Sequence, residues 1–349
     1  MDGLKIDTRQ IRLLEKLCNA LSVSGDETEV RRIVRSELEN FVDEIRVDAL
    51  GNLLAIQHAG SSRALRVLLA AHMDEVGLMI VGGEGPGIFR FDKIGGIKVN
   101  ELVGKQVIVG KEHKPAVIGC RPIHLQTPDD YKKVIELDSL RIDLGKYESI
   151  KIGERAAFAT KFQRAGPSIM AKSIDNRIGV AILIELIKNA PENLEVCAAF
   201  TVQEEIGARG AAVAAHYFKP DAAFVIDATP AYDFPAHDQV ENLKYNTQLG
   251  KGPAIYVADK STIYHPGLFQ AMIKTTKDNK IPYQIRQPAG GGTDAAAIQN
   301  SLAGIPTLAV SVPHRYPHSP VSVARLADWK IALNLLHTAL RNISPAAIR

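Results

Sequence analysis

The chain has 349 residues, 46% of them hydrophobic and 23% charged, and a formal net charge of +3 at pH 7. This length allows about two domains, and the composition is that of an ordinary globular protein. The charge is small and no basic block is present, so the pattern of a nucleic-acid-binding protein is missing. The longest apolar run, IGVAILIELI, is too short to cross a bilayer and contains Glu185, so we expect no membrane partner.

The N-terminal segment and the cysteines predict the location. MDGLKIDTRQIRLLEKL is polar and amphipathic and lacks the apolar core of a signal peptide. Cys18, Cys120 and Cys197 are far apart, odd in number and form no CxxC pair. Reduced cysteines and no secretion signal together indicate a cytoplasmic protein.

Two amphipathic helices are predicted at the start of the chain. Residues 7–21 carry leucines at helical spacing, so that one stripe of the helix is apolar. Residues 24–41 continue as a second helix. This helix starts with Ser24-x-x-Glu27, the pattern of a capping box, in which the two side chains bond the free amides of the first turn.

Strand patterns follow these helices. Residues 43–57 predict two short strands around a Gly-Asn turn. The run ALRVLLAAHMD, residues 64–74, is almost continuously apolar, which is typical of a central strand buried on both faces. This strand ends at His72 and Asp74.

The character of the chain changes over residues 75–168. Glycines crowd the stretch VGGEGPGIFRFDKIGG, and short alternating stretches such as KQVIVGKEHKPAVIGC follow. One weak helical pattern appears, over residues 129–138. We therefore predict a small β-rich domain, 75–168, inserted into a larger domain formed by residues 1–74 and 169–349.

Helices and strands alternate again from residue 169, which predicts an α/β protein with a layered sheet. The predicted helices cover residues 175–190, 208–218, 265–279, 294–301 and about 323–341. The predicted strands cover residues 194–202, 221–228, 282–286 and 306–312.

Histidine, aspartate and glutamate follow several of these strands. In open α/β sheets, sites gather at the carboxyl ends of the strands. One strand ends at His72 and Asp74, and another leads directly into two adjacent glutamates. The glutamates of that pair are Glu204 and Glu205. The remaining candidates are Asp227, His314 and His318 on or after the later strands, and Asp175 at the start of the helix predicted over residues 175–190.

Each candidate also has an ordinary structural explanation. Asp175 could cap its helix, His72 could be a hydrogen-bonded core histidine, and Asp227 could belong to a turn. Glu204 and Glu205 could form a solvated turn, and the late histidines could be exposed. A single metal site explains all of these residues together, because imidazole and carboxylate suit zinc and its first-row neighbours. The absence of cysteine ligands favours a catalytic site over a structural zinc.

Motifs of several other hydrolases are missing. HExxH, GxSxG and GxxxxGK[ST] do not occur, which argues against helical zinc proteases, serine hydrolases and P-loop enzymes. The glycine run AGGGTDAAA is not followed by the lysine of a phosphate loop. Glu204 and Glu205 are sequence neighbours and cannot flank one glycosidic bond, although a glycosidase could use another pair.

Several short stretches carry a family resemblance: SVSGDE, AAHMDEVG, SIDNRIG, TVQEEIGARGA, VIDATP, GGGTDAA and RYPHSP. In this order, and over nearly the whole chain, they resemble the cytosolic dinuclear-metal aminopeptidases that assemble into tetrahedral dodecamers, the TET aminopeptidases. The family includes glutamyl and deblocking aminopeptidases and some proteins named endoglucanases.

The resemblance implies two divalent metal ions per subunit: zinc, with cobalt or manganese as alternatives. His72 and Asp227 would bind the first ion. Glu205 and His318 would bind the second, and Asp175 would bridge the two.

It also implies roles for residues around the metals. Asp74 would orient the first metal's histidine. Glu204 would be the general base. The choice of Glu204 over Glu205 for this role rests on the resemblance alone. Asp294 lies in a stretch that lines the site in the family, and we expect it near the substrate. His314 departs from the pattern, which has a small polar residue before RY and selects the later histidine as ligand. We expect His314 to shape the substrate pocket.

The implied fold is a zinc-peptidase-like α/β/α catalytic domain with an inserted β-rich dimerisation domain. The implied function is removal of N-terminal residues from short peptides with a free N-terminus, by a homododecamer built from dimers. Two alternatives stay open: a metal-binding assembly or regulatory subunit with little activity of its own, and a metal-dependent deacylase or glycan hydrolase on the same fold.

Overall fold

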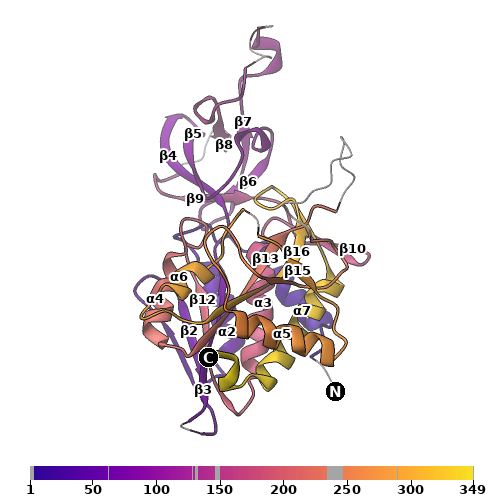
Figure 1. Cartoon of the computed structure of the whole chain (residues 1–349). Coiled ribbons are helices and arrows are strands. Elements are labelled where there is room, and N and C mark those ends of the chain that lie inside the picture. The colour runs from indigo at the N-terminus through magenta and orange to yellow at the C-terminus, as the bar shows by residue number, and fades with distance from the viewer. Residues whose placement is uncertain are drawn as a thin grey trace.

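The computed structural model of the chain describes residues 4–61, 63–127, 129, 133–145, 150–233, 247–288 and 290–348. Figure 1 shows a large body of helices and strands with a smaller β-barrel at one end. The expectation of an α/β fold with a barrel-like insert is confirmed.

A mixed sheet of 11 strands forms the centre of the large body in the described part of the chain. Its middle consists of four parallel neighbours in the order β12 (Leu194–Thr201), β3 (Leu65–His72), β13 (Ala222–Pro230) and β16 (Thr307–Arg315). These strands are buried almost throughout, which explains their nearly unbroken apolar sequences. Because they run in one direction, their carboxyl ends meet at the same edge of the sheet.

The other strands extend this centre on both sides, mostly by antiparallel pairing. β1 and β2 pair around the predicted turn and place β2 beside β12. The strands are β1 (Glu44–Val47), β2 (Leu53–Gln57), β10 (Gln163–Ala165), β11 (Ser168–Ala171), β14 (Ala254–Tyr256), β15 (Gln284–Arg286) and β17 (Ser322–Arg325).

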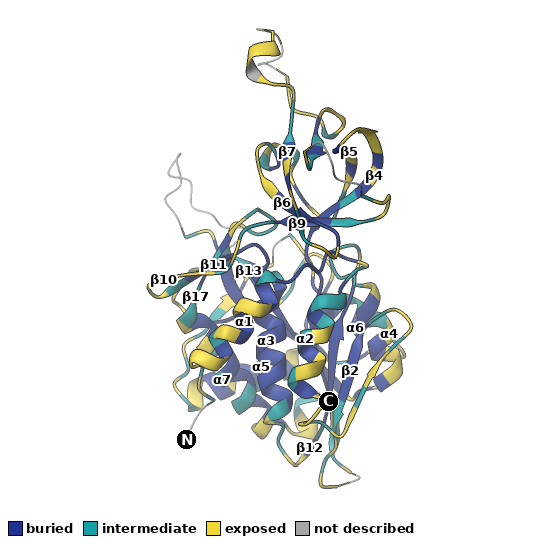
Figure 2. Cartoon of the chain, turned by 180° about the vertical axis from the view of Figure 1, so that it is seen from behind, coloured by how far each residue is buried: buried dark blue, intermediate teal, exposed yellow. Residues whose placement is uncertain are grey.

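Helices cover both faces of the sheet. The α-helices are α1 (Thr8–Asn19), α2 (Thr28–Leu38), α3 (Ile174–Lys188), α4 (Arg209–Phe218), α5 (Pro266–Asp278), α6 (Ala295–Gln299) and α7 (Leu326–Asn342). On one face α3 packs on β3 and β13 and is itself covered by α1, α2 and α7 (Figure 2). On the other face α4 and α6 pack together. Within the described ranges, no helix combines the length and the apolar composition that a bilayer crossing requires.

The position of α3 explains its composition. Its residues from Ile178 to Ile187 are buried on all sides of the helix, as the uniform dark ribbon in Figure 2 shows. A helix that is apolar on nearly all sides, with Glu185 as the one charged residue of this stretch, must be surrounded by protein. The sheet on one side and three helices on the other provide that environment, so the start of α3 is held firmly at the edge where the strands end.

The smaller unit is a closed barrel. Its strands are β4 (Gly77–Gly85), β5 (Ile88–Ile94), β6 (Gln106–Val109), β7 (Lys114–Gly119), β8 (Arg141–Asp143) and β9 (Arg155–Phe158), closed in the order β4-β5-β8-β7-β6-β9. Its own apolar core includes Leu78, Ile118 and Ile142. Closure leaves no exposed sheet edge. The chain returns from the barrel to the large sheet between β9 and β10.

The barrel contacts the large body closely at Gly77. A side-chain carbon at this position would lie 2.3 Å from a methyl group of Val23 and 2.8 Å from the carbonyl oxygen of Ala156. Only glycine leaves room for this approach. Val23 belongs to the segment between α1 and α2, so the glycine fixes the start of the barrel against the large body.

The predicted capping box at Ser24 is wrong. α2 begins at Thr28, with Glu27 at the cap position and no side-chain capping bond. Ser24 instead donates its hydroxyl hydrogen to Asp74 at 2.6 Å, and the Glu27 carboxylate accepts from the amide of Gly25. A buried carboxylate competes for the serine hydroxyl, and local sequence does not reveal that partner.

The structure also differs from two of the predicted helices. In the stretch 129–138, whose residues 130–132 lie outside the described part, the helix observed is a short 3-10 turn, Leu137–Ser139. The closing helix begins at Leu326, because the preceding residues form β17 and pair with β16 and β11. The other 3-10 turns in the described part of the chain are Val99–Glu101, Ile123–Leu125 and Pro345–Ile348.

Candidate metal centre

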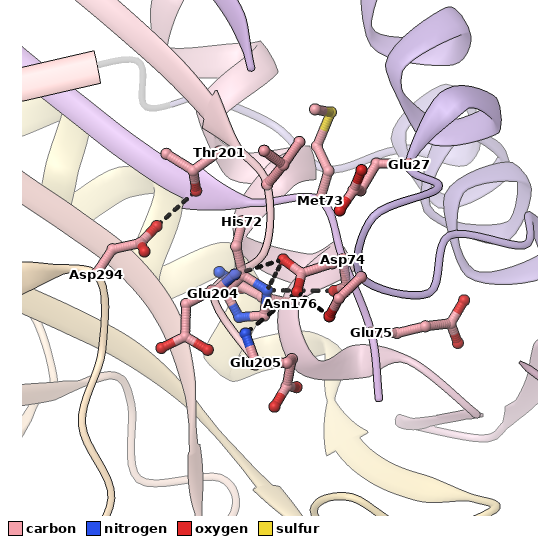
Figure 3. Close-up of polar contacts among 12 residues, drawn as sticks. Glu27, His72, Met73, Asp74, Glu75, Asn176, Thr201, Glu204, Glu205 and Asp294 are labelled. Atoms are coloured by element: carbon pink, nitrogen blue, oxygen red, sulfur yellow. Dashed lines mark hydrogen bonds and ion pairs between the residues drawn. The ribbon is translucent and has the colours of Figure 1, made fainter. Parts of the chain in front are cut away.

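The carboxyl ends of the four central strands bring the predicted site residues together. His72 is the last residue of β3 and is paired in register with Thr201, the last residue of β12. The turn after β12 carries the two glutamates, close to His72 and Asp74 in Figure 3. The later strands contribute the remaining members: Asp227 within β13, His314 within β16 and His318 just after β16.

One group of possible ligands is formed by His72, Asp175 and Asp227; we call it the first site. The Nε2 atom of His72 lies 3.2 Å from Oδ1 of Asp175 and 3.6 Å from Oδ1 of Asp227. All three donor atoms lie within 4.8 Å of one another. This spacing could be satisfied by one cation between them.

A second group is formed by Asp175, Glu205 and His318; we call it the second site. The Nε2 atom of His318 lies 3.4 Å from Oε2 of Glu205 and 3.9 Å from Oδ2 of Asp175. These donor atoms also lie within 4.8 Å of one another. Asp175 therefore belongs to both sites, with Oδ1 toward the first and Oδ2 toward the second.

Asp175 does not cap its helix. Its backbone is non-helical, with φ −78° and ψ 111°, and so is that of Asn176. The side chain of Asn176 accepts a hydrogen bond from the amide of Gly179 at 3.0 Å and donates one to the carbonyl of Ile226 at 2.8 Å. Asn176 thus satisfies the first turn, and the carboxylate of Asp175 is available at the sheet edge.

Asp74 organises the residues around it. Its Oδ1 lies 3.4 Å from Nδ1 of His72, which also lies 3.2 Å from the Asp74 carbonyl oxygen. Its carboxylate accepts the amide hydrogens of Glu204 at 3.0 Å and Glu205 at 3.2 Å, and the hydroxyl hydrogen of Ser24. One buried carboxylate therefore fixes the imidazole of β3 and the backbone of both glutamates (Figure 3).

The two histidines face the cluster in the same way. Nδ1 of His72 faces Asp74, and Nδ1 of His318 lies 3.3 Å from the carbonyl oxygen of Gly96. Each ring thus has an outer partner and turns Nε2 toward Asp175. Outer partners of this kind fix the tautomer that leaves Nε2 free to bind a metal. Gly96 lies just beyond β5, so the barrel contributes a group to the site.

Electrostatics of the carboxyl groups reflect their crowding. Burial raises the pKa of Glu204 well above its ordinary range, and the negative charges of Glu205, Asp294 and Asp227 raise it further. Burial also raises the pKa of Glu205 to about 8 and that of Asp227 to about 6. Converging carboxylates are costly without a compensating positive charge.

The pKa values of Asp175 and His72 shift in the direction opposite to the one that burial alone would cause. Burial alone would raise the pKa of Asp175, but the bond to His72 and the nearby imidazoles lower it to about 2. Burial would lower the pKa of His72, yet its contacts with Asp175, Asp227 and Asp74 raise it well above the usual value. The proton held there is one that a metal ion would replace.

The donor set fits divalent metal ions. It combines two imidazole nitrogens with carboxylate oxygens and contains no thiolate, which suits zinc and its first-row neighbours. Each imidazole has its outer nitrogen occupied by protein. The shared carboxylate has one oxygen for each site. Two ions would supply the charge that this group of acids requires.

The structure places His314 and Asp294 next to the group of possible metal ligands. His314 is fully buried, and Nε2 lies 3.8 Å from Oδ2 of Asp175. Neither of its ring nitrogens has a hydrogen-bond partner among the described residues, and burial lowers its pKa to about 4. Asp294 accepts a hydrogen bond from Thr201 at 2.5 Å, and burial raises its pKa to about 7.

A cavity of about 1400 Å³ opens over the centre. His72, Glu204 and Glu205 line its floor, and Lys98 and Tyr316 are among the residues of its walls. His314 and Asp294 are not among its lining residues in the described part of the chain. The cavity reaches from the edge of the large sheet to the barrel segment around Lys98, so both units of the fold shape it.

Sequence reasoning missed several residues that hold the site. The sequence predicts a capping role for Ser24 and assigns no role to Gly96 or Asn176. Ser24 lies within SVSGDE, but neither the capping pattern nor the family resemblance of this stretch identifies Asp74 as its partner. Backbone carbonyls such as that of Gly96 carry no side-chain signal, so no sequence pattern could have identified this contact.

Comparison with known proteins adds independent information. The sequence model of the M42 glutamyl aminopeptidase family matches residues 51–335. The lysyl aminopeptidase of Pyrococcus furiosus is 31% identical over 347 residues, which cover 95% of this chain and 97% of that protein.

Solved structures agree with the sequence comparison. A TET aminopeptidase from a marine sediment archaeon of the Thaumarchaeota has a TM-score of 0.91 and 31% identity, covering 97% of this chain and 98% of its own. The Pyrococcus horikoshii TET1 peptidase can assemble into a tetrahedron or a large octahedral shell. Its TM-score is 0.85 and its identity 35%, and the match covers 96% of this chain and 100% of that chain.

Proposed function

The chain belongs to the M42 glutamyl aminopeptidase family, whose members are aminopeptidases, and we propose that it works with two metal ions and a glutamate base. In this proposal it removes single residues from the free N-termini of short peptides. The observation that carries the proposal is the sharing of Asp175 by two groups of ligands, each completed by a histidine and a second carboxylate.

We assign the metal ligands as follows. His72 and Asp227 hold one ion, Glu205 and His318 hold the other, and Asp175 serves both. Two divalent ions bound there would lower the pKa of a water molecule and polarise the scissile carbonyl. We take zinc as the metal, with cobalt and manganese as alternatives, because all three accept this ligand set.

Glu204 is the general base of the proposed reaction. Its carboxylate lines the cavity floor beside His72, and its backbone is held by Asp74. It accepts the proton of the attacking water and then donates it to the amine of the departing peptide. Burial raises the pKa of this carboxyl group, and the charge of two bound metal ions would oppose that rise and keep the resting carboxylate ionised, as a base requires.

The cavity supports a short peptide as the substrate. Its volume of about 1400 Å³ exceeds that of typical small-molecule sites, and its floor is the metal centre itself. A chain end can reach that floor. We therefore propose exopeptidase action on short peptides rather than cleavage within folded proteins.

We further propose that the chain assembles through its inserted domain. The division into a catalytic domain, 1–74 with 169–349, and a dimerisation domain, 75–168, is part of this proposal. Its support is the likeness to the Pyrococcus horikoshii peptidase and the closed barrel at one end of the molecule. A tetrahedral dodecamer built from dimers in the cytoplasm, with active sites facing a chamber, is the expected form.

A substrate panel tests the activity against its alternatives. Aminoacyl-anilides, N-acylated amino acids and cello-oligosaccharides are incubated with the protein, with and without zinc or cobalt. We expect metal-dependent cleavage of the aminoacyl-anilides only. Faster cleavage of an acylated amino acid or a glycan would assign the protein to another hydrolase class, and no cleavage by metal-loaded protein would favour an inert assembly subunit.

A further inference from the structure

Three charged side chains are buried together behind the metal centre: Glu75, Lys172 and Arg177. Glu75 is 2% exposed, Lys172 6% and Arg177 0%. In Figure 3 the Glu75 side chain points away from His72, so it does not belong to the group of possible ligands. The proposed reaction gives these three residues no role.

The carboxylate of Glu75 joins the two cations. It accepts hydrogen bonds from Nζ of Lys172, at 2.6 Å to Oε2, and from Nη2 of Arg177, at 3.0 Å to Oε1. It also accepts the amide hydrogen of Ser22 at 3.1 Å. Lys172 donates further to the carbonyl of Ala20 at 2.8 Å. The cluster therefore connects the segment after α1, the segment after β3 and the start of α3.

The sequence positions of the three residues relate them to the first site. Glu75 directly follows Asp74, in the segment that leaves His72. Lys172 and Arg177 lie on either side of Asp175. The ion pairs thus tie together the two segments that carry His72 and Asp175.

Arg177 also contacts the group that orients His72. Its guanidinium donates to the carbonyl oxygens of Met73 and Asp74, the latter at 3.1 Å. The same Asp74 carbonyl oxygen lies 3.2 Å from Nδ1 of His72. A shift of Arg177 would therefore move the outer partner of the imidazole.

Stability alone does not account for such a cluster. Buried ion pairs cost desolvation, and apolar side chains of similar size often give equal or greater stability. Arg177 makes fixed bonds to several carbonyl groups, which apolar packing cannot reproduce. Directional bonds of this kind hold backbone segments at a defined separation.

We propose that Glu75, Lys172 and Arg177 form a positioning clamp that holds His72 against Asp175 and thereby sets the metal affinity of the first site. The clamp rests on the proposed function, because it presumes that the first site binds a metal ion. The three residues touch neither substrate nor metal and act through the two ligand segments.

The test compares Glu75→Gln with wild type. Glutamine keeps the shape of the side chain and removes the charge that holds both cations. Zinc is titrated into chelator-treated protein in competition with a chromophoric chelator, which yields the affinity of each site. We expect affinity at the first site to fall by about 10- to 100-fold, the usual effect of losing an outer partner, and affinity at the second site to change little.

Glu37→Gln is the matched control. Glu37 pairs with Lys188 at 2.7 Å, and Lys188 ends α3 whereas Asp175 stands at its start. This variant removes ion pairs that join α2 to the end of α3 distant from Asp175 and to Arg9 in α1. We expect both zinc affinities of the control to match wild type, whatever happens to its melting temperature.

The outcomes separate the clamp from the proposed function. Wild type that binds no zinc would refute the proposed function, whereas wild type that binds two ions with the same affinities as Glu75→Gln would refute the clamp alone. If Glu75→Gln does not fold, Lys172→Met decides, since it leaves Glu75 paired with Arg177; it should weaken the first site selectively. Failure of both variants to fold even with zinc would make the cluster a stability element and overturn the proposal.

Discussion

His72 and Asp175 meet through Nε2 and Oδ1 at 3.2 Å, although the whole barrel lies between them in the sequence. One residue ends β3 and the other precedes the regular part of α3. The first site therefore exists only when the two outer parts of the chain have folded together. Because the site exists only in the folded protein, metal binding should raise the free energy of unfolding. A measurement of stability with and without metal therefore reports on metal binding.

Removal of metal should lower the stability of the protein. A ligand that binds only the folded state stabilises it by about 2.7 kcal/mol at a free concentration of 100 Kd. We expect chelator-treated protein to gain stability on addition of zinc or cobalt, seen as a rise in Tm by calorimetry. Magnesium at equal concentration is the control, because it prefers oxygen ligands and retains its waters. A Tm that zinc and magnesium change equally would contradict the proposed sites.

Substitution of the two adjacent glutamates should have different effects. Glu204→Gln keeps the side-chain shape but removes the base, so kcat should fall by about 10²- to 10⁴-fold while two metal ions stay bound. Glu205→Gln removes a charged ligand of the second site, so metal content should fall and excess metal should restore part of the activity.

Metal analysis by mass spectrometry beside metal-titrated kinetics distinguishes the two glutamates. Loss of metal in Glu204→Gln but not in Glu205→Gln would exchange their roles. If neither substitution changed metal content or rate, the pair would be an ordinary solvated turn.

Asp74→Asn should weaken metal binding without removing a ligand. The carboxylate holds His72 and accepts both glutamate amides, and an asparagine oxygen can replace only part of this. We expect the affinity of the first site to fall by about 10- to 100-fold. Ser24→Ala removes one donor to Asp74 and should have the same effect in weaker form. Isothermal titration with zinc would measure the loss of affinity in each variant. A larger loss in Ser24→Ala than in Asp74→Asn would show that Asp74 is not the group that orients His72.

The two late histidines should differ in metal content. His318 lies 3.4 Å from Glu205 and belongs to a possible ligand group, whereas His314 lies 3.8 Å from Asp175 and belongs to no such group among the described residues. His318→Gln should therefore lose about one ion per subunit by mass spectrometry. His314→Gln should retain both. A loss of metal from His314→Gln alone would move the ligand assignment to that residue.

Glu27 should make stability depend on pH. Burial raises its pKa from 4.5 to about 7. The folded state then holds the proton more tightly than the unfolded chain. The contribution of protonated Glu27 to the free energy of unfolding is therefore fully present below pH 4.5 and is lost as the pH rises to about 7. Glu27→Gln cannot ionise, and its oxygen can still accept from the amide of Gly25.

We expect Glu27→Gln to match wild type near pH 4.5 and to exceed its free energy of unfolding by on the order of 3 kcal/mol above pH 7. Urea unfolding of both proteins at several pH values, in the presence of chelator, measures this difference. A difference that does not grow with pH would mean that folding does not raise the pKa of Glu27.

Local patterns determined the elements and the candidate list. The apolar runs of β3, β12, β13 and β16 and the helical spacing elsewhere are properties of neighbouring residues, so they can be interpreted without coordinates. Parallel strands place their carboxyl ends at one edge, which is why polar residues after those runs could be named together in advance. The family motifs indicated which role each residue would have, and the spacing of the residues alone did not.

Tertiary structure decided how these residues are used. It assigned the Ser24 hydroxyl to Asp74 rather than to a helix cap, and it gave the capping function to Asn176 rather than Asp175. It also placed the Gly96 carbonyl of the barrel segment beside His318. Each of these contacts joins distant parts of the chain or competes with a local bond, and only packing determines which partner is closer.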